Sequence, residues 1–189
     1  MRFHSKYDAS STADDCHLTY LLDRFLTVQF SGIFAYTCCC AKWGGQLMRV
    51  EDFVNEFISK MLEWENERRS YIRSSDYKKN VDGARDSFNR KCHDRLAEII
   101  AKYLSPKAAE TLGKSKLITM GVGNPPIYDQ SIESAESKGS KVKVICKSNN
   151  GALPDAVVRY GLIKSGDGWL IDEVHSSSDK AKWRKNNSI

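Results

Sequence analysis

The stretch that decides the fold is Arg159-Tyr160-Gly161-Leu162-Ile163-Lys164-Ser165-Gly166-Asp167-Gly168-Trp169-Leu170-Ile171-Asp172-Glu173. Before its Ser-Gly-Asp-Gly segment, Val158, Tyr160 and Leu162 recur at every second position, which is the period of a β-strand. The segment itself has the composition of a tight turn, and the chain then returns through an apolar run. The sequence therefore predicts an antiparallel hairpin of residues 156–164 and 169–175.

A second hairpin is predicted upstream of the first. Val142, Val144 and Cys146 alternate with lysines, so residues 127–137 and 141–148 are expected to pair around Lys138-Gly139-Ser140. Residues 124–126, Asn-Pro-Pro, form a loop because proline cannot donate a hydrogen bond within a central strand. Residues 116–120 are interpreted as a further short strand.

Two amphipathic helices precede these strands. Apolar residues follow i, i+3, i+4, i+7 spacing over residues 50–72, and a second apolar face covers residues 81–104. A short helical turn at residues 107–112 is expected to end at Gly113. Helices followed by antiparallel hairpins predict an α+β fold, a cone with one open end in which a strongly curved sheet packs on the N-terminal helices. Its interior is expected to bury Phe57, Phe88, Tyr160 and Trp169 together.

The composition is typical of one globular domain. The chain has 189 residues, of which 41% are apolar and 28% charged, and its net charge is +5. The basic excess is modest and dispersed, so it does not support a nucleic-acid partner. Cys92 and Cys146 are expected to be buried free thiols, which suits a cytoplasmic protein. Three adjacent cysteines, Cys38 to Cys40, match neither a zinc site nor a disulfide framework, and no cofactor or metal is indicated.

The first 47 residues differ from the rest. Residues 25–41 lack charge, but they are short for a membrane span and lack the basic segment of a signal peptide. Gly44-Gly45 stands three residues before Met48, and two glycine codons can encode a bacterial ribosome-binding site. We therefore hypothesise that residues 1–47 are upstream translation or a disordered leader. The single α+β domain is assigned to residues 48–178, and residues 179–189 are predicted to be a basic flexible tail.

The order of helix, helix, Pro-Pro loop and hairpins, closing on Lys164, the glycine turn, Trp169, Ile171 and Asp172, resembles the nuclear transport factor 2-like fold. Within it, residues 48–176 resemble the small bacterial immunity proteins that neutralise polymorphic toxins. The resemblance implies a cytoplasmic antitoxin, without membrane or nucleic-acid binding, that occludes one cognate toxin domain in competition between bacteria. A homodimer through an open sheet face is compatible with this fold.

Candidate residues fall into two sets. Residues expected to contact the partner are Trp64, Tyr71, Tyr128, Asp129, Arg159 and Asp172, since aromatic and arginine side chains concentrate in protein interfaces. Residues expected to face the cone cavity are Tyr160, Trp169 and Glu173. The chain is mildly basic, which disfavours a strongly basic nuclease as partner, although an acidic patch at Glu63, Glu65 and Glu67 would alter that balance.

The alternatives to an immunity protein remain open at this stage. One is a small-molecule binder or an isomerase- or dehydratase-like enzyme, in which an inward carboxylate and Tyr160 would act as an acid–base pair inside the cone. Another is an interaction module of an envelope system. The sequence has no phosphate loop, GxSxG elbow, HExxH or paired CxxC motif, and adjacent His93 and Asp94 diverge on a helix. We therefore expect a binding protein without catalytic residues.

The hypothesis about residues 1–47 predicts the mass of the natural product. We expect the protein expressed from its own gene to begin at Met48, and intact-mass spectrometry measures this directly. A mass that includes residues 1–47 would contradict the hypothesis.

Overall fold

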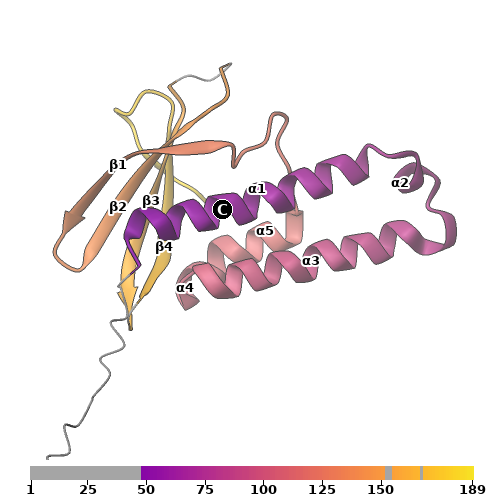
Figure 1. The fold of residues 1–189 in the computed structure, drawn as a ribbon, viewed down its shortest axis with the longest axis horizontal. Coiled ribbons are helices and arrows are strands. Elements are labelled where there is room, and N and C mark those ends of the chain that lie inside the picture. The colour runs from indigo at the N-terminus through magenta and orange to yellow at the C-terminus, as the bar shows by residue number, and fades with distance from the viewer. Residues whose placement is uncertain (1–47, 152–154, 167) are drawn as a thin grey trace, which may run out of the picture. The chain divides into compact units, whose positions relative to one another are not determined.

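The computed structural model describes residues 48–151, 155–166 and 168–189. Residues 1–47, with their apolar run and the hypothesised upstream translation, lie outside the described residues. Figure 1 shows two long helices side by side, with a sheet packed against one end of the pair. The helices are α1 (Val50–Ile72) and α3 (Ala84–Tyr103), and the sheet follows them in the chain. The α+β class predicted from the sequence is confirmed.

The first helix has the predicted bounds. Glu51 and Asp52 occupy its first turn and Arg69 its last, as the helix dipole favours. The connection to α3 is more structured than predicted, because it contains a short helix, α2 (Ser75–Lys79), whose N-cap Ser74 accepts a hydrogen bond from the Tyr77 amide. A 3₁₀ turn, η1 (Val81–Gly83), then delays the start of α3 by three residues relative to the prediction.

Two expectations for the following segment are wrong. Helix α4 (Pro106–Ala108), the π-helical turn η2 (Ala109–Gly113) and α5 (Lys114–Thr119) follow one another without a break, so Gly113 does not end a helix and residues 116–120 are not a strand. A Cβ at Gly113 would lie 2.7 Å from Ile100 Cγ2, so this glycine permits close packing on α3. Ile118 and Thr119 favour a strand locally, but the helix places Lys116 in the buried interior.

The sheet is an antiparallel meander with strand order β1-β2-β3-β4-β5, and it is not closed. The strands are β1 (Gln130–Lys138), β2 (Lys141–Ser148), β3 (Val157–Ser165), β4 (Gly168–Ser177) and β5 (Arg184–Lys185). Both predicted hairpins are therefore present. Residues 179–189, predicted as a flexible tail, contribute β5, which pairs with β4 through His175–Lys185 and Ser176–Arg184.

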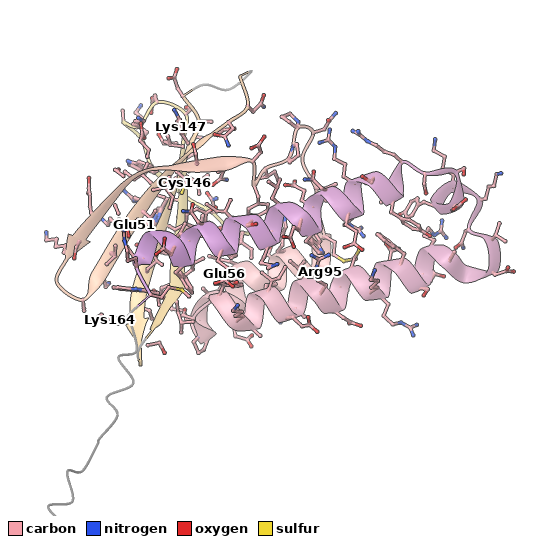
Figure 2. The ribbon with its side chains drawn as sticks, in the orientation of Figure 1. Glu51, Glu56, Arg95, Cys146, Lys147 and Lys164 are labelled. Atoms are coloured by element: carbon pink, nitrogen blue, oxygen red, sulfur yellow. The ribbon has the colours of Figure 1, made fainter. Side chains whose placement is uncertain are left out.

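Alternate residues of the sheet face opposite environments. Cys146 of β2 is buried against the helices, whereas its neighbour Lys147 is exposed (Figure 2). On β3 the same alternation buries Tyr160 and leaves Arg159 half-buried on the outer face. The strand period thus separates an inner face that packs on the helices from an outer face turned away from them.

The core is organised around the ring of Phe57 on α1. Its centroid lies 5.6 Å from Tyr103 of α3, 5.7 Å from Tyr160 of β3 and 6.2 Å from Tyr128 in the loop before β1. The last two contacts are edge-to-face, the arrangement that aromatic quadrupoles favour. Trp169 packs at the margin of this core. Phe88 does not join it, contrary to expectation, because it stacks on Tyr71 at the far end of the helix pair.

A buried carboxylate connects α1 to the loop before the sheet. Glu65 is fully buried, and it accepts hydrogen bonds from the amide of Gly123 and, at 3.1 Å, from the amide of Tyr128. Buried Lys116 donates to the Gly121 carbonyl at 2.9 Å, and its ammonium lies over the Trp64 and Tyr128 rings. Burial lowers the pKa of Lys116, while the Glu65 charge acts in the opposite direction. The loop is therefore held by two backbone amides that donate their hydrogen bonds to the Glu65 carboxylate.

This network predicts a large difference between two neighbouring glutamates. Glu65→Ala leaves the buried Tyr128 amide and the half-buried Gly123 amide without their acceptor and removes the charge that favours ionised Lys116, and we expect it to lower the free energy of unfolding by about 3 kcal/mol. Glu63→Ala, at an exposed position two residues earlier, should change it by less than about 1 kcal/mol. Urea denaturation followed by circular dichroism measures both. Equal effects of the two substitutions would contradict the assigned role.

Candidate functional site

The mouth of the cone contains a surface pocket of about 280 Å³. It lies between the Pro-Pro loop and the ends of β2, β3 and β4. Its lining is uncharged and comprises Asn124, Pro125, Pro126, Ile127, Gln130, Ser148, Asn150, Ala156, Val157, Val158, Ser176 and Ser177. An acid–base enzyme needs convergent ionisable groups around its cavity, and this lining supplies none.

The two tyrosines below this mouth are packed core residues. The Tyr160 hydroxyl donates to Gln130 Oε1 at 3.1 Å, and Tyr160 is only 2% exposed. Burial raises the pKa of Tyr160, and burial also raises the pKa of Tyr128 well above its ordinary value. Both phenols therefore stay protonated at neutral pH, and neither provides a base to a cavity.

The His93–Asp94 pair and Glu173 lie apart from the cone interior, and Cys146 is a packed core residue. His93 and Asp94 are exposed on α3, with 3.5 Å between Nδ1 and Oδ1. Glu173 pairs with Gly161 on the outer face of the sheet, where its side chain covers the space beside the glycine. Burial raises the pKa of the Cys146 thiol to about 12. Within the described ranges, no group of three or more His, Cys, Asp and Glu side chains is arranged to hold a metal ion.

The structure places Trp64 and Tyr128 in the core. Trp64 is fully buried and donates from Nε1 to the Cys92 carbonyl at 2.9 Å, and Tyr128 is 2% exposed. A partner cannot reach such side chains without opening the core, so we no longer expect Trp64 and Tyr128 to contact it. The aromatic character of both residues is explained by packing around Phe57 and Lys116.

Three further predicted residues have local structural contacts. Tyr71 is half-buried between Tyr77 and Phe88 at the far end of the helix pair. Asp129 accepts from the side-chain amide of Asn149 at 2.9 Å. Trp169 donates from Nε1 to the Met48 carbonyl at 3.1 Å, near the start of α1 rather than at the pocket.

Asp172 joins β4 to the helical side. Its Oδ1 accepts from the Ser105 hydroxyl at 2.7 Å, and its Oδ2 lies 3.3 Å from the Lys107 ammonium. The Ser105 hydrogen bond, followed by Lys107, holds the pKa of Asp172 below its ordinary value. Ser105 also caps α4, since its hydroxyl accepts from the Ala108 amide. This contact orients a helix start against the sheet.

Arg159 is the predicted contact residue that contacts an aromatic side chain from the C-terminal segment. It lies on the outer face of β3, and its guanidinium carbon is 4.3 Å from the centroid of the Trp183 ring. Sequence reasoning missed Trp183 because the surrounding basic residues indicated a solvated tail. A tryptophan within such a run was the available signal, since tryptophan and arginine are enriched at binding hot spots.

The charges between the two long helices are compensated. Arg95 of α3, labelled in Figure 2, pairs with Glu63 and Glu67 of α1, while Lys91 lies 3.1 Å from Glu67. Lys102 likewise lies 2.8 Å from Glu56. The acidic patch considered from the sequence is therefore absent as a free surface, because Glu65 is buried and its neighbours are paired with cations.

A cone of this topology, filled by aromatic side chains and with an uncharged mouth, defines an NTF2-like protein whose interior is packed. The family model described as NTF2 fold immunity protein matches residues 49–187, which include the helices and all five strands. The chain belongs to this family of immunity proteins. Comparison with curated proteins and with solved structures gives no match. In the described part of the chain, no helix has the length and apolarity needed to cross a membrane.

The Asp172 contact predicts a pH-dependent stability difference. Because its pKa is lower in the folded protein, ionised Asp172 stabilises the fold above about pH 4, and this contribution disappears as the pH falls through the folded-state pKa. We expect Asp172→Asn to lower the free energy of unfolding by about 1 kcal/mol at pH 7. The difference from wild type should shrink between pH 5 and pH 2.5, as urea titrations at each pH would measure. A difference independent of pH would contradict this role.

Proposed function

We propose that this immunity protein acts by binding the toxin domain of a secreted or contact-dependent bacterial effector and occluding its active site or substrate approach. The observation that carries the proposal, beside the family assignment, is the packed cone. Phe57, Tyr128 and Tyr160 fill the interior where enzymes of this fold place reactive groups. Protection would then come from a stoichiometric complex in the cytoplasm of the producing cell, without cofactor or turnover.

The pocket at the cone mouth supports one competing function, the binding of a small molecule. Its uncharged, largely apolar walls suit a neutral ligand more than an acid–base reaction. Gln130 lines the pocket, and its Oε1 accepts a hydrogen bond from the buried Tyr160 hydroxyl. The two functions differ in which residues matter, since occlusion depends on the surface and ligand binding depends on this pocket.

Co-expression tests the proposal. The full chain is produced beside the toxin domain encoded immediately upstream of its gene, and survival and co-purification are measured. We expect rescue with a stable complex of the two proteins, and a folded protein that neither rescues nor binds a demonstrably toxic neighbour would overturn the proposal.

The pocket variants Tyr160→Phe and Gln130→Ala serve as the matched comparison. Occlusion through the outer sheet face predicts rescue equal to wild type from both, because Tyr160 is buried and Gln130 lies at the pocket. Loss of rescue by folded variants that still bind the toxin would instead assign the protective function to the pocket.

A further inference from the structure

The outer face of the sheet carries a row of basic side chains on adjacent strands. Arg159 of β3 pairs in register with His175 of β4, and His175 pairs with Lys185 of β5. Directly opposed residues project to the same side of an antiparallel sheet, so the three basic side chains are neighbours. We name Arg159, His175 and Lys185 the cationic row.

Flanking residues extend this charge. Lys143 and Lys147 of β2 are exposed, and both side chains point to the outer face of the sheet. Cys146, next to Lys147, points inward and is buried. Arg159, Lys185 and Lys143 each act electrostatically on His175, which places all three around it. Two carboxylates lie among these cations: Glu173 of β4 opposes their effect on His175, and Glu136 of β1 is the cross-strand partner of Lys143.

The cationic row lacks the compensation found on the helical side. Among the residues that the structure describes, no carboxylate oxygen lies within 4.0 Å of the side-chain nitrogens of Lys143, Arg159 or Lys185. Burial lowers the pKa of His175, so the charges of the row at neutral pH are those of Arg159 and Lys185, on either side of the imidazole. An external anionic surface would supply the counter-charges that these two side chains lack.

The row also contains an aromatic anchor. The Trp183 ring stacks on the Arg159 guanidinium, which fixes the position of a long cationic side chain. The Nδ1 atom of His175 is buried and has no hydrogen-bond partner among the described residues. Rigid arginine and tryptophan side chains, together with an unsatisfied polar atom, are features of a binding surface more than of a merely solvated strand face.

We propose that this outer face, centred on Arg159, His175, Lys185 and Trp183, is the docking surface for an acidic patch on the toxin domain. The inference rests on the proposed function and specifies its surface. A second copy of the chain fits the same face poorly, because a two-fold contact there would oppose the cationic rows of both copies. An acidic partner neutralises the row, and its approach is accelerated by the attraction between opposite charges.

Matched charge reversals test the surface. The first variant of the full chain carries Lys143→Glu and Lys185→Glu on the outer face. The control carries Lys78→Glu and Lys114→Glu, two exposed lysines of α2 and α5 that change the net charge equally. Binding to the toxin domain is measured by surface plasmon resonance at low and physiological salt, and thermal melting confirms that both variants are folded.

We expect the outer-face variant to bind on the order of 100-fold more weakly, mainly through slower association, while the control stays within about 3-fold of wild type. Wild-type chain that fails to bind the toxin would overturn the proposed function together with this surface. Wild-type binding that the outer-face variant retains in full would overturn the surface alone.

A nucleic acid is the competing anionic ligand, and a short DNA duplex serves as its probe. Loss of duplex binding by the outer-face variant, with toxin binding unchanged, would assign the row to nucleic acid and overturn the proposal. Toxin binding that depends on the row, with no duplex binding by wild type, supports it.

Discussion

The contact between Phe57 and the surrounding tyrosines is the constraint on which the structure depends. One ring on α1 touches Tyr103 of the second helix, Tyr128 of the connecting loop and Tyr160 of the sheet. Helices, loop and sheet therefore meet at a single side chain, and each buries its aromatic residue against the same ring. Close packing around this ring fills the region between helices and sheet with buried side chains.

That packing determines where function can lie. An enzyme of this fold uses the space between sheet and helices, whereas here the inner face is committed to the core. The facing surfaces of α1 and α3 have their charges paired with one another. The outer face of the sheet differs from the helical surfaces because, among the described residues, Lys143, Arg159 and Lys185 have no carboxylate oxygen within 4.0 Å. The general role given by the immunity family and the particular surface proposed here are thus consistent with one arrangement of charge and burial.

The sequence predicts the parts of the fold in which local pattern and tertiary packing agree. The alternation around Tyr160 identifies β3 and its hairpin, and the apolar spacing from Val50 gives α1 its bounds. Prediction fails where tertiary contacts determine the secondary structure. Gly113 has the residue type of a helix end, yet its missing side chain serves the approach of Ile100. Residues 116–120 have strand propensity, yet the buried environment of Lys116 requires the helix.

The candidate contact residues show the same division. Aromatic type alone suggested Trp64 and Tyr128 as surface anchors, but a buried tryptophan and an interfacial tryptophan look identical in sequence. Distinguishing them requires knowledge of which helix face meets the sheet. Arg159 could be proposed because a charged residue inside an alternating strand must point outward. Its neighbours in the row come from β4 and from β5, a two-residue strand without a periodic signal of its own, so their proximity depends on strand register.

The two-residue period of β3 also places residues that stabilise the core and residues available for recognition on opposite faces of the sheet. Tyr160 and Arg159 are adjacent in the chain, but the first is held by Phe57 and Gln130 while the second contacts Trp183 on the outside. Exposed substitutions away from packed contacts usually change stability by about 0.5 kcal/mol or less, whereas core truncations change it by several. Outer-face residues can therefore change to match a different toxin while the aromatic core stays constant. The surface proposed to dock the toxin can thus accept substitutions that the packed core cannot.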